Sequence, residues 1–370
     1  DLISEGGGVH PRTAKSIPIT PQVAERLGLE GEDPLTPAEL ISAILRSPVD
    51  LLWNGGIGTY VKASTQSHAE VGDKANDAIR VDGRDLRVEV VGEGGNLGLT
   101  QLGRIEAAQY GVRINTDAID NSAGVDCSDH EVNIKILLGQ VVTDGDLTLK
   151  HRNLLLAEMT DDVATRVLRD NYEQNVLLGN ARSQTHIMLG VHQRFLRQLE
   201  HEGQVDRALE FLPSDEEFAQ RQEAEQGLAS PEFAVLVAYA KITLKQTILH
   251  SEIPDEPWVK SWLRGYFPQV LVERYPEKVD THQLRREIIA TLLAGDLVNR
   301  GGITFVYRAA EETAAAAPQI VRAYAAARQI FDLDSYARMV ESHDTRIPTD
   351  LQAELYLELR RLFDRSVRWL

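Results

Sequence analysis

Short apolar runs alternate with helix-like stretches over roughly the first third of the chain. The runs VDLLW at 49–53 and LRVEVV at 86–91 are nearly continuous in apolar residues, as is typical of strands buried on both faces of a parallel sheet. Helix-like stretches at 66–80 and 100–110 separate them from each other and from a third short run, VRIN at 112–115. This order predicts parallel strands joined by helices.

After about residue 130, apolar residues recur three and four positions apart, which predicts an all-helical region. Ser230, followed by proline and glutamate, is predicted to cap one of its helices. The last helix is predicted to bury one apolar face: Leu351, Leu355, Leu359, Leu362 and Phe363. The fold class is therefore α/β plus all-α, with one domain over residues 1–145 and a helical C-terminal domain over residues 146–370.

Charge and cysteine content narrow the classes of partner. The chain has 370 residues, with 56 acidic against 39 basic residues and a net charge of −17, so its field repels nucleic acid and anionic membrane surfaces. Its single cysteine, Cys127, forms no internal disulfide and is expected to be buried, and no apolar run is long enough to span a bilayer. We therefore predict a cytoplasmic protein without nucleic-acid or membrane partners.

Two predicted strands end in glycine pairs with an asparagine. Residues 54–56 read Asn-Gly-Gly, and residues 93–96 read Glu-Gly-Gly-Asn within a pattern close to G-x-G-x-x-G. Ligands of open α/β sheets bind outside the carboxyl ends of the strands, and glycine lets a flat ring or ribose approach the backbone closely. These two strand ends are therefore predicted to lie at a nucleotide site.

A third polar cluster spans residues 115–133. Its acidic residues and His130 resemble a metal site in composition, but the spacing of Cys127, Asp129 and His130 matches no zinc or calcium loop. We therefore predict no metal. Ser128, followed by two acidic residues, is instead predicted to cap a helix whose N-terminus receives a carboxylate substrate.

Longer motifs resemble one family. Residues 93–96 are similar to the E-G-A/G-N strand end of glutamate dehydrogenases, and residues 121–131 to their N-A-G-G-V-x-x-S-x-x-E segment, with Ala123 in place of a glycine. The segments LISEGGGV, PRTAKSIPI, DLLWNGGIGTY, VGDKAND, NTDAIDNSAGVDCSDHEVNIKILL and SPEFAVL resemble the C-terminal portion of the very large bacterial NAD-specific glutamate dehydrogenases. The resemblance covers nearly the whole chain.

The resemblance implies a partial Rossmann-like domain whose first βαβ unit, phosphate loop and catalytic residues lie upstream, so that no catalytic residue is expected here and the chain alone is expected to be inactive. It implies NAD as cofactor, bound by Asn54, Gly55, Gly56, Glu93, Gly94, Gly95 and Asn96. Asn121 is implied to lie near the nicotinamide or the substrate α-carboxylate. Ser128 is implied to hydrogen-bond the distal carboxylate of glutamate.

The implied reaction is oxidative deamination of L-glutamate to 2-oxoglutarate and ammonium. Two alternatives remain open: a dehydrogenase of another amino acid, and a non-catalytic helical scaffold or regulatory module that keeps a vestigial nucleotide fold. A homo-oligomer is expected. The aromatic residues Trp258, Trp262, Tyr266 and Phe267 form either its interface or a small separate core.

Overall fold

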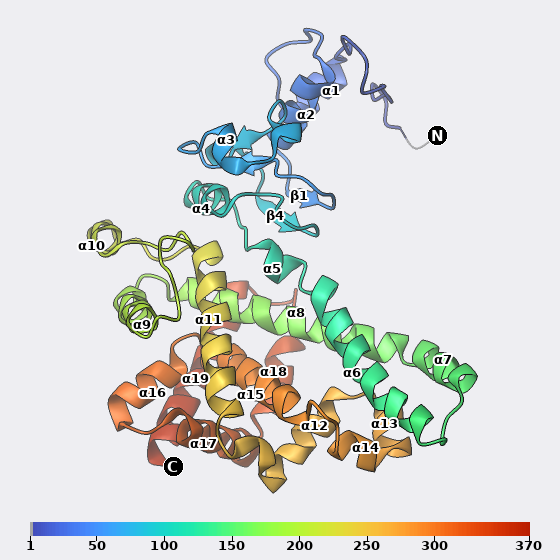
Figure 1. Cartoon of the computed structure of the whole chain (residues 1–370). Helices are drawn as coiled ribbons and strands as arrows, with labels where there is room; N and C mark the ends of the chain where they lie inside the picture. The colour runs from blue at the N-terminus through green and yellow to red at the C-terminus, as the bar shows by residue number, and fades with distance from the viewer. Residues whose placement is uncertain (1–2) are drawn as a thin grey trace. The chain divides into compact units, whose positions relative to one another are not determined.

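The computed structural model describes residues 3–370, which divide into two compact units (Figure 1). The first unit runs to Asn121 and also includes Ala229–Ala234, and the second comprises Ser122–Leu228 and Val235–Leu370. The predicted domain assignment, with its boundary after residue 145, stays a prediction.

The first unit is built from short parallel strands and short helices. β1 pairs with β4, from Leu51 opposite Val90 to Asn54 opposite Glu93, and β2 pairs with β3. The predicted parallel pairing is confirmed, although the second strand lies at 90–93, later than the predicted 86–91. The elements are α1 (Pro21–Leu27), α2 (Pro37–Leu45), β1 (Leu51–Asn54), β2 (Val61–Lys62), α3 (His68–Val71), η1 (Lys74–Asn76), β3 (Val81–Asp82), η2 (Gly83–Asp85), β4 (Val90–Glu93), α4 (Gln101–Gln109) and α5 (Asp117–Asp120).

Two predicted elements of this unit are shorter than expected. The run at 112–115 forms only an isolated parallel bridge between Arg113 and Val90. The predicted helix at 66–80 is interrupted after α3, because Gly72 takes a left-handed φ of 77° at the helix C-cap. The carboxylate of the next residue, Asp73, accepts hydrogen bonds from the Thr59 amide (2.8 Å) and the Asn76 side chain (2.7 Å).

Apolar side chains from the strands and from α4 fill the core of the first unit. The loop residue Leu99 is 2% exposed and Ala107 of α4 is fully buried. The core consists of Val61, Val81, Leu86, Val88, Val91, Leu99, Ala107, Val112 and Ile114. This core lies beneath the strands whose carboxyl ends carry the glycine turns.

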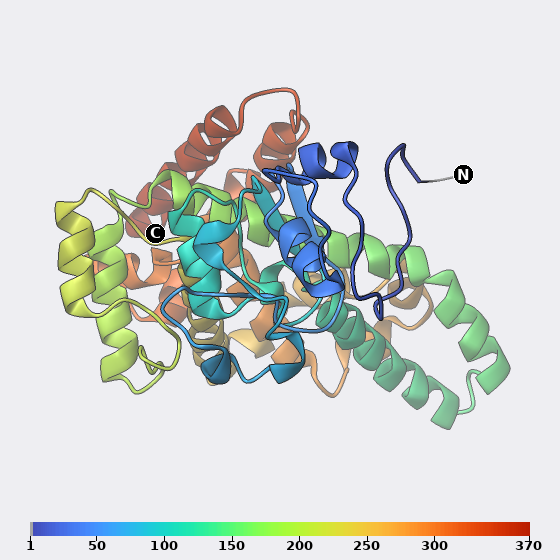
Figure 2. The same cartoon turned by 90° about the horizontal axis from the view of Figure 1, so that it is seen from above.

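The second unit is all helical among its described residues, as predicted, and Figure 2 shows α9 and α10 side by side. Its helices are α6 (Ala123–Thr143), α7 (Leu149–Glu158), α8 (Thr160–Ser183), α9 (Leu189–His201), α10 (Asp215–Glu223), α11 (Ser230–Leu249, whose first turn belongs to the first unit), η3 (Ile253–Asp255), η4 (Pro257–Val259), α12 (Lys260–Tyr266), α13 (Gln269–Arg274), α14 (Pro276–Asp280), α15 (Arg285–Gly301), α16 (Phe305–Thr313), α17 (Ala317–Ile330), α18 (Leu333–Glu341) and α19 (Thr349–Trp369).

The apolar face predicted for the last helix, α19, is only partly correct. Leu359 and Phe363 are buried, and the Phe363 ring stacks on Tyr324 with 4.9 Å between centroids. Leu351 is exposed, since at about 100° per residue it lies roughly 80° around the helix from Leu359. The buried face instead includes Ala353 and Tyr356.

The predicted aromatic cluster lies at α12 and η4. Tyr266 and Phe267 are buried, whereas Trp262 is half-buried beneath the Arg328 guanidinium, 4.5 Å from the ring centroid. Tyr266 and Phe267 therefore belong to the core of the helical unit. In the part of the chain that the structure describes, no helix is both long and apolar enough to cross a membrane.

A network of four charged side chains joins three helices of this unit. Arg169 on α8 donates to both carboxylate oxygens of Glu341 on α18, at 2.7 and 2.8 Å. Arg300 on α15 donates to Glu173 on α8 at 2.8 Å and lies 3.4 Å from Glu341. The network fixes α8, α15 and α18 relative to one another.

Candidate functional site

The parallel pairing of β1 and β4 brings the two predicted glycine turns together. Asn54 ends β1 opposite Glu93, which ends β4. The Gly95 amide donates to the Asn54 carbonyl oxygen at 3.0 Å, and the Gly56 amide donates to Asn54 Oδ1 at 3.3 Å. Both turns therefore lie at the carboxyl edge of the sheet, where ligands of open α/β sheets bind.

The turns require glycine because their backbones touch. A Cβ atom on Gly95 would stand 2.5 Å from the carbonyl oxygen of Gly56. One on Gly94 would stand 2.4 Å from the indole of Trp53, whose ring lies along this part of β4. A side chain at Gly95 would therefore push the two turns apart, whereas one at Gly94 would displace the Trp53 indole.

Glu93 lies beneath the loop and does not face solvent. Its side chain is fully buried, and its two carboxylate oxygens accept hydrogen bonds from Arg104 Nε at 2.7 Å and Arg104 Nη2 at 2.9 Å. Its carboxylate also accepts from the Leu99 amide at 3.2 Å. Burial raises the pKa of Glu93, while the hydrogen bonds and charge of Arg104 act in the opposite direction. The Glu93 carboxylate thus holds the loop in place from inside.

Two acidic residues that follow the loop bind its backbone. Asp117 accepts from the Leu97 amide at 2.8 Å and pairs with Arg104 at 3.1 Å. Asp120 accepts from the Glu93 amide at 3.0 Å. These carboxylates are therefore used to shape the glycine loop.

The structure brings Asn96 and Asn121 into contact. Asn121 Nδ2 donates to Asn96 Oδ1 at 2.9 Å, so the residue predicted near the cofactor ribose and the residue predicted near the nicotinamide or substrate share a hydrogen bond. Asn54 differs, because its Nδ2 is buried and has no hydrogen-bond partner among residues 3–370. An unpaired buried donor costs roughly 1–3 kcal/mol.

Sequence reasoning missed the apolar rim of this site. Leu97 takes a left-handed φ of 58°, and both its amide and its carbonyl are held by side chains, Asp117 and Thr59. Its own side chain is 65% exposed, and Trp53 is 62% exposed. The positive φ of Leu97 is thus fixed by its two hydrogen-bond partners, and these hold an apolar side chain at the surface beside the glycine turns. The only sequence signal for Leu97 and Trp53 was their position beside the glycines.

The structure corrects two expectations about residues 127 and 128. Ser128 does not cap a helix, because α6 already begins at Ala123, after Ser122, and Ser128 lies in its second turn with Oγ 3.4 Å from the Gly124 carbonyl oxygen. Cys127 was expected to be buried and is exposed. The substrate role of Ser128 stays a prediction, and its side chain is exposed.

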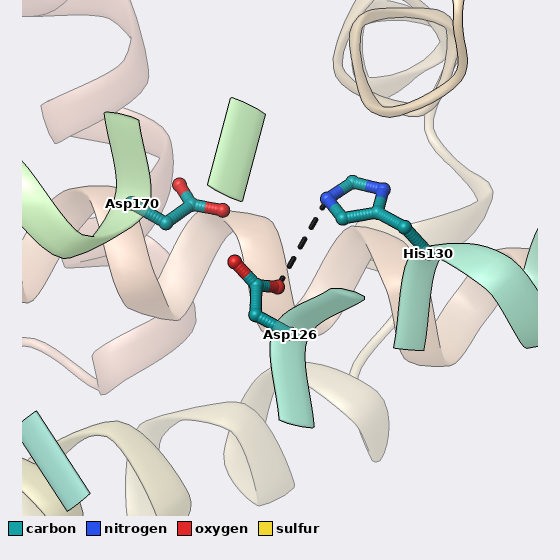
Figure 3. Close-up of side chains that lie close together, drawn as sticks. All are labelled: Asp126, His130 and Asp170. Carbon is teal, nitrogen blue, oxygen red and sulfur yellow. Dashed lines mark ion pairs between the residues drawn. The ribbon is translucent and has the colours of Figure 1, made fainter. Parts of the chain in front are cut away.

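A cluster that the sequence did not reveal lies in the helical unit. Asp126 and His130 on α6 face Asp170 on α8, and one ligand atom from each lies within 4.8 Å of the others (Figure 3). Asp170 follows the predicted cluster at 115–133 by almost forty residues. Only the packing of α6 against α8 brings it close.

Comparison with known proteins agrees with the motifs. Residues 1–181 match the family described as bacterial NAD-glutamate dehydrogenase, catalytic domain, and residues 225–370 match glutamate dehydrogenase, C-terminal. Proteins named NAD-specific glutamate dehydrogenase are similar over this whole chain: those of Halomonas elongata (53% identity over 369 residues), Pseudomonas aeruginosa (51% over 368) and Mycobacterium tuberculosis (49% over 374).

These matches confirm the resemblance seen in the motifs. The chain, an α/β unit followed by a helical unit, is similar in sequence to dehydrogenases. The chain belongs to the family of bacterial NAD-dependent glutamate dehydrogenases. It spans 23% of the length of each of these three relatives.

Proposed function

We propose that this chain is part of an NAD-dependent glutamate dehydrogenase, which converts L-glutamate, NAD⁺ and water to 2-oxoglutarate, ammonium and NADH. Within it, residues 1–145 form part of a Rossmann-like dinucleotide-binding domain without its first βαβ unit, and residues 146–370 form a helical domain. The observation that carries the proposal is the pair of glycine turns touching at the carboxyl edge of β1 and β4. The names of the relatives support the choice of NAD and glutamate.

Some residues of the turns contact the cofactor in this proposal, and others hold the turns in position. Gly55, Gly56, Gly94 and Gly95 leave the backbone open to the nicotinamide ribose, and the paired amides of Asn96 and Asn121 offer donors and acceptors beside it. We assign Glu93 a positioning role, because its carboxylate is fully buried and bound to Arg104.

The cofactor supplies the hydride acceptor, and the protein must hold the glutamate α-carbon facing it. Orienting two reactants in this way removes much of the entropic barrier to their reaction. We place Asn121 and the exposed hydroxyl of Ser128 on the substrate side, as donors to the carboxylates of glutamate. Carboxylates accept such hydrogen bonds more strongly than neutral oxygens do.

We also infer a cytoplasmic homo-oligomer without nucleic-acid or membrane partners. The net charge of −17 supports the exclusion of polyanions. Exposed apolar residues near the end of α19, such as Trp369 and Leu370, support association with another copy.

The test of the proposal is NADH binding by the complete enzyme with Gly95→Ala. The new Cβ would collide with the Gly56 carbonyl oxygen, so we expect the Kd for NADH, measured by fluorescence titration, to rise at least about tenfold. Gly139→Ala in α6 is the matched control, because nothing lies within 4 Å of its new Cβ and NADH affinity should stay unchanged. Wild-type affinity in folded Gly95→Ala would overturn the proposal.

A further inference from the structure

The cluster of Asp126, His130 and Asp170 has the donor set of a metal site. Asp126 and His130 are four residues apart on α6, so both project from one face of the helix, and Asp170 reaches the same point from α8 (Figure 3). Two carboxylate oxygens and one imidazole nitrogen converge within 4.8 Å.

Hydrogen bonds within the protein do not satisfy this cluster. The His130 side chain is 4% exposed, yet its Nε2, the ring nitrogen that faces Asp126, stands 4.0 Å from Asp126 Oδ1, too far for a hydrogen bond. Asp126 Oδ2 is buried and receives no hydrogen bond within residues 3–370. Buried polar atoms left in this way are costly unless a ligand binds them.

The charges of the cluster also favour a cation. An imidazole nitrogen with a free lone pair is a common metal ligand, and Nε2 is the His130 nitrogen that lies nearest to Asp126. Carboxylate oxygens of Asp126 and Asp170 lie within 4.8 Å of each other, so the two groups repel when both are ionised and a cation between them relieves that repulsion.

Neighbouring basic residues do not form ion pairs with these carboxylates. No Lys or Arg nitrogen in the described part of the chain lies within 4.0 Å of Asp126 or Asp170. Lys241 is the basic residue that acts on Asp170, and burial lowers its own pKa to about 8. Within the described residues the two carboxylates thus lack an ion pair with Lys or Arg, and the charge of Lys241 acts on Asp170 from a greater distance.

We propose that Asp126, His130 and Asp170 bind one divalent transition-metal cation of the Zn²⁺ type and thereby join α6 to α8. Carboxylate oxygens and imidazole bind Zn²⁺ at about 2.0–2.2 Å, so small side-chain rotations suffice to close the ligand atoms around the ion. Three protein ligands leave a fourth position for water.

The three ligands come from two helices, so a bound cation would link α6 to α8. The site does not depend on the cofactor role proposed for the first unit. A cation that binds only the folded chain raises its melting temperature. Binding and stability can therefore both be measured without any assay of turnover.

The experiment is a calorimetric titration of the EDTA-treated 370-residue chain with ZnCl₂. We expect one saturable site with a Kd below about 10 µM, and a Kd at least about tenfold higher in Asp170→Asn, which keeps the side-chain shape at an exposed position. Cys127→Ser is the matched control, because this exposed thiol lies next to Asp126 and is the nearest alternative zinc ligand by sequence.

The variants decide the assignment. Wild-type affinity in Cys127→Ser, together with a zinc-dependent rise in melting temperature that is absent in Asp170→Asn, would support the site. The proposal fails if the wild type shows no saturable one-to-one binding, if Asp170→Asn binds as tightly as wild type, or if Cys127→Ser loses the site.

Discussion

The two compact units use buried ion pairs for different purposes. In the first unit, Arg104 binds Glu93 and Asp117 and so holds a glycine loop at the end of β4. In the second unit, Arg300 and Arg169 link Glu173 and Glu341 and so hold helices together. The first arrangement depends on one guanidinium, and the second shares its charges among four residues.

The difference follows from where the backbone hydrogen bonds go. Helices satisfy their own amides and carbonyls, so the network of the second unit only fixes their packing. The glycine loop lacks these regular backbone hydrogen bonds, so side chains accept hydrogen bonds from its amides instead. Glu93 accepts from the Leu99 amide, and Asp117 accepts from the Leu97 amide. We therefore expect damage to the first network to reach the proposed cofactor site, and damage to the second to affect stability alone.

Arg104→Met should have the largest effect. It leaves the fully buried Glu93 carboxylate without its partner, and breaking such a pair costs about 3–5 kcal/mol of unfolding free energy. Urea denaturation measures this loss, with Arg84→Met as control, since Arg84 is half exposed and pairs only at 3.9–4.0 Å. A loss below about 1 kcal/mol for Arg104→Met would contradict the role given to this side chain.

The second unit should lose stability at acid pH through His192. Burial, with the charge of Arg308, lowers the pKa of His192 from 6.5 to about 4. The folded state therefore favours the neutral ring, so its contribution is complete above pH 6.5 and is lost as pH falls from 6.5 towards 4, by about 3 kcal/mol in all. His192→Gln should flatten the measured stability between these pH values, whereas replacement of the exposed His343 should not.

Arg300→Met should cost about 2 kcal/mol, less than Arg104→Met, because Arg169 still pairs with both Glu173 and Glu341. In the complete enzyme, NADH affinity should stay at the wild-type value, measured by fluorescence titration of the folded variant. The exposed Lys135–Glu131 pair serves as a control whose loss should cost well under 1 kcal/mol. A large drop in NADH affinity for Arg300→Met would remove the distinction between the units.

Ser128→Ala should have the smallest effect on stability, within about 0.5 kcal/mol, because Ser128 is exposed inside α6 and caps nothing. In the complete enzyme it should raise the KM for glutamate by about 1–2 kcal/mol of lost hydrogen bonding and leave the KM for NAD⁺ unchanged. Steady-state kinetics beside a melting curve separates the two effects. An unchanged KM for glutamate would end the proposed substrate contact.

Local signals in the sequence predicted the elements that local chemistry determines. The apolar runs at 49–53 and 86–91 contain most of β1 and the start of β4, and the region after residue 130 is helical as its apolar spacing predicts. The adjacency of the two glycine turns followed from parallel pairing of those strands. Features that follow from the general pairing rule of parallel strands could thus be predicted from the sequence.

Features that depend on particular distant partners were not accessible. Nothing near Glu93 in the sequence indicates that Arg104 binds both of its oxygens, and nothing near Asp126 indicates Asp170. The cap at Ser128 was predicted wrongly because α6 starts six residues earlier, with Ser122 at its N-cap position, and both serines are residues that local chemistry favours there.

Hydrogen–deuterium exchange of the complete enzyme with and without NADH tests the central claim most directly, since it reports on each segment in the same experiment. We expect slower exchange at residues 54–58 and 94–98 when NADH is bound, and unchanged exchange in α15 and α19. Unchanged exchange in both glycine turns at saturating NADH would contradict the claim.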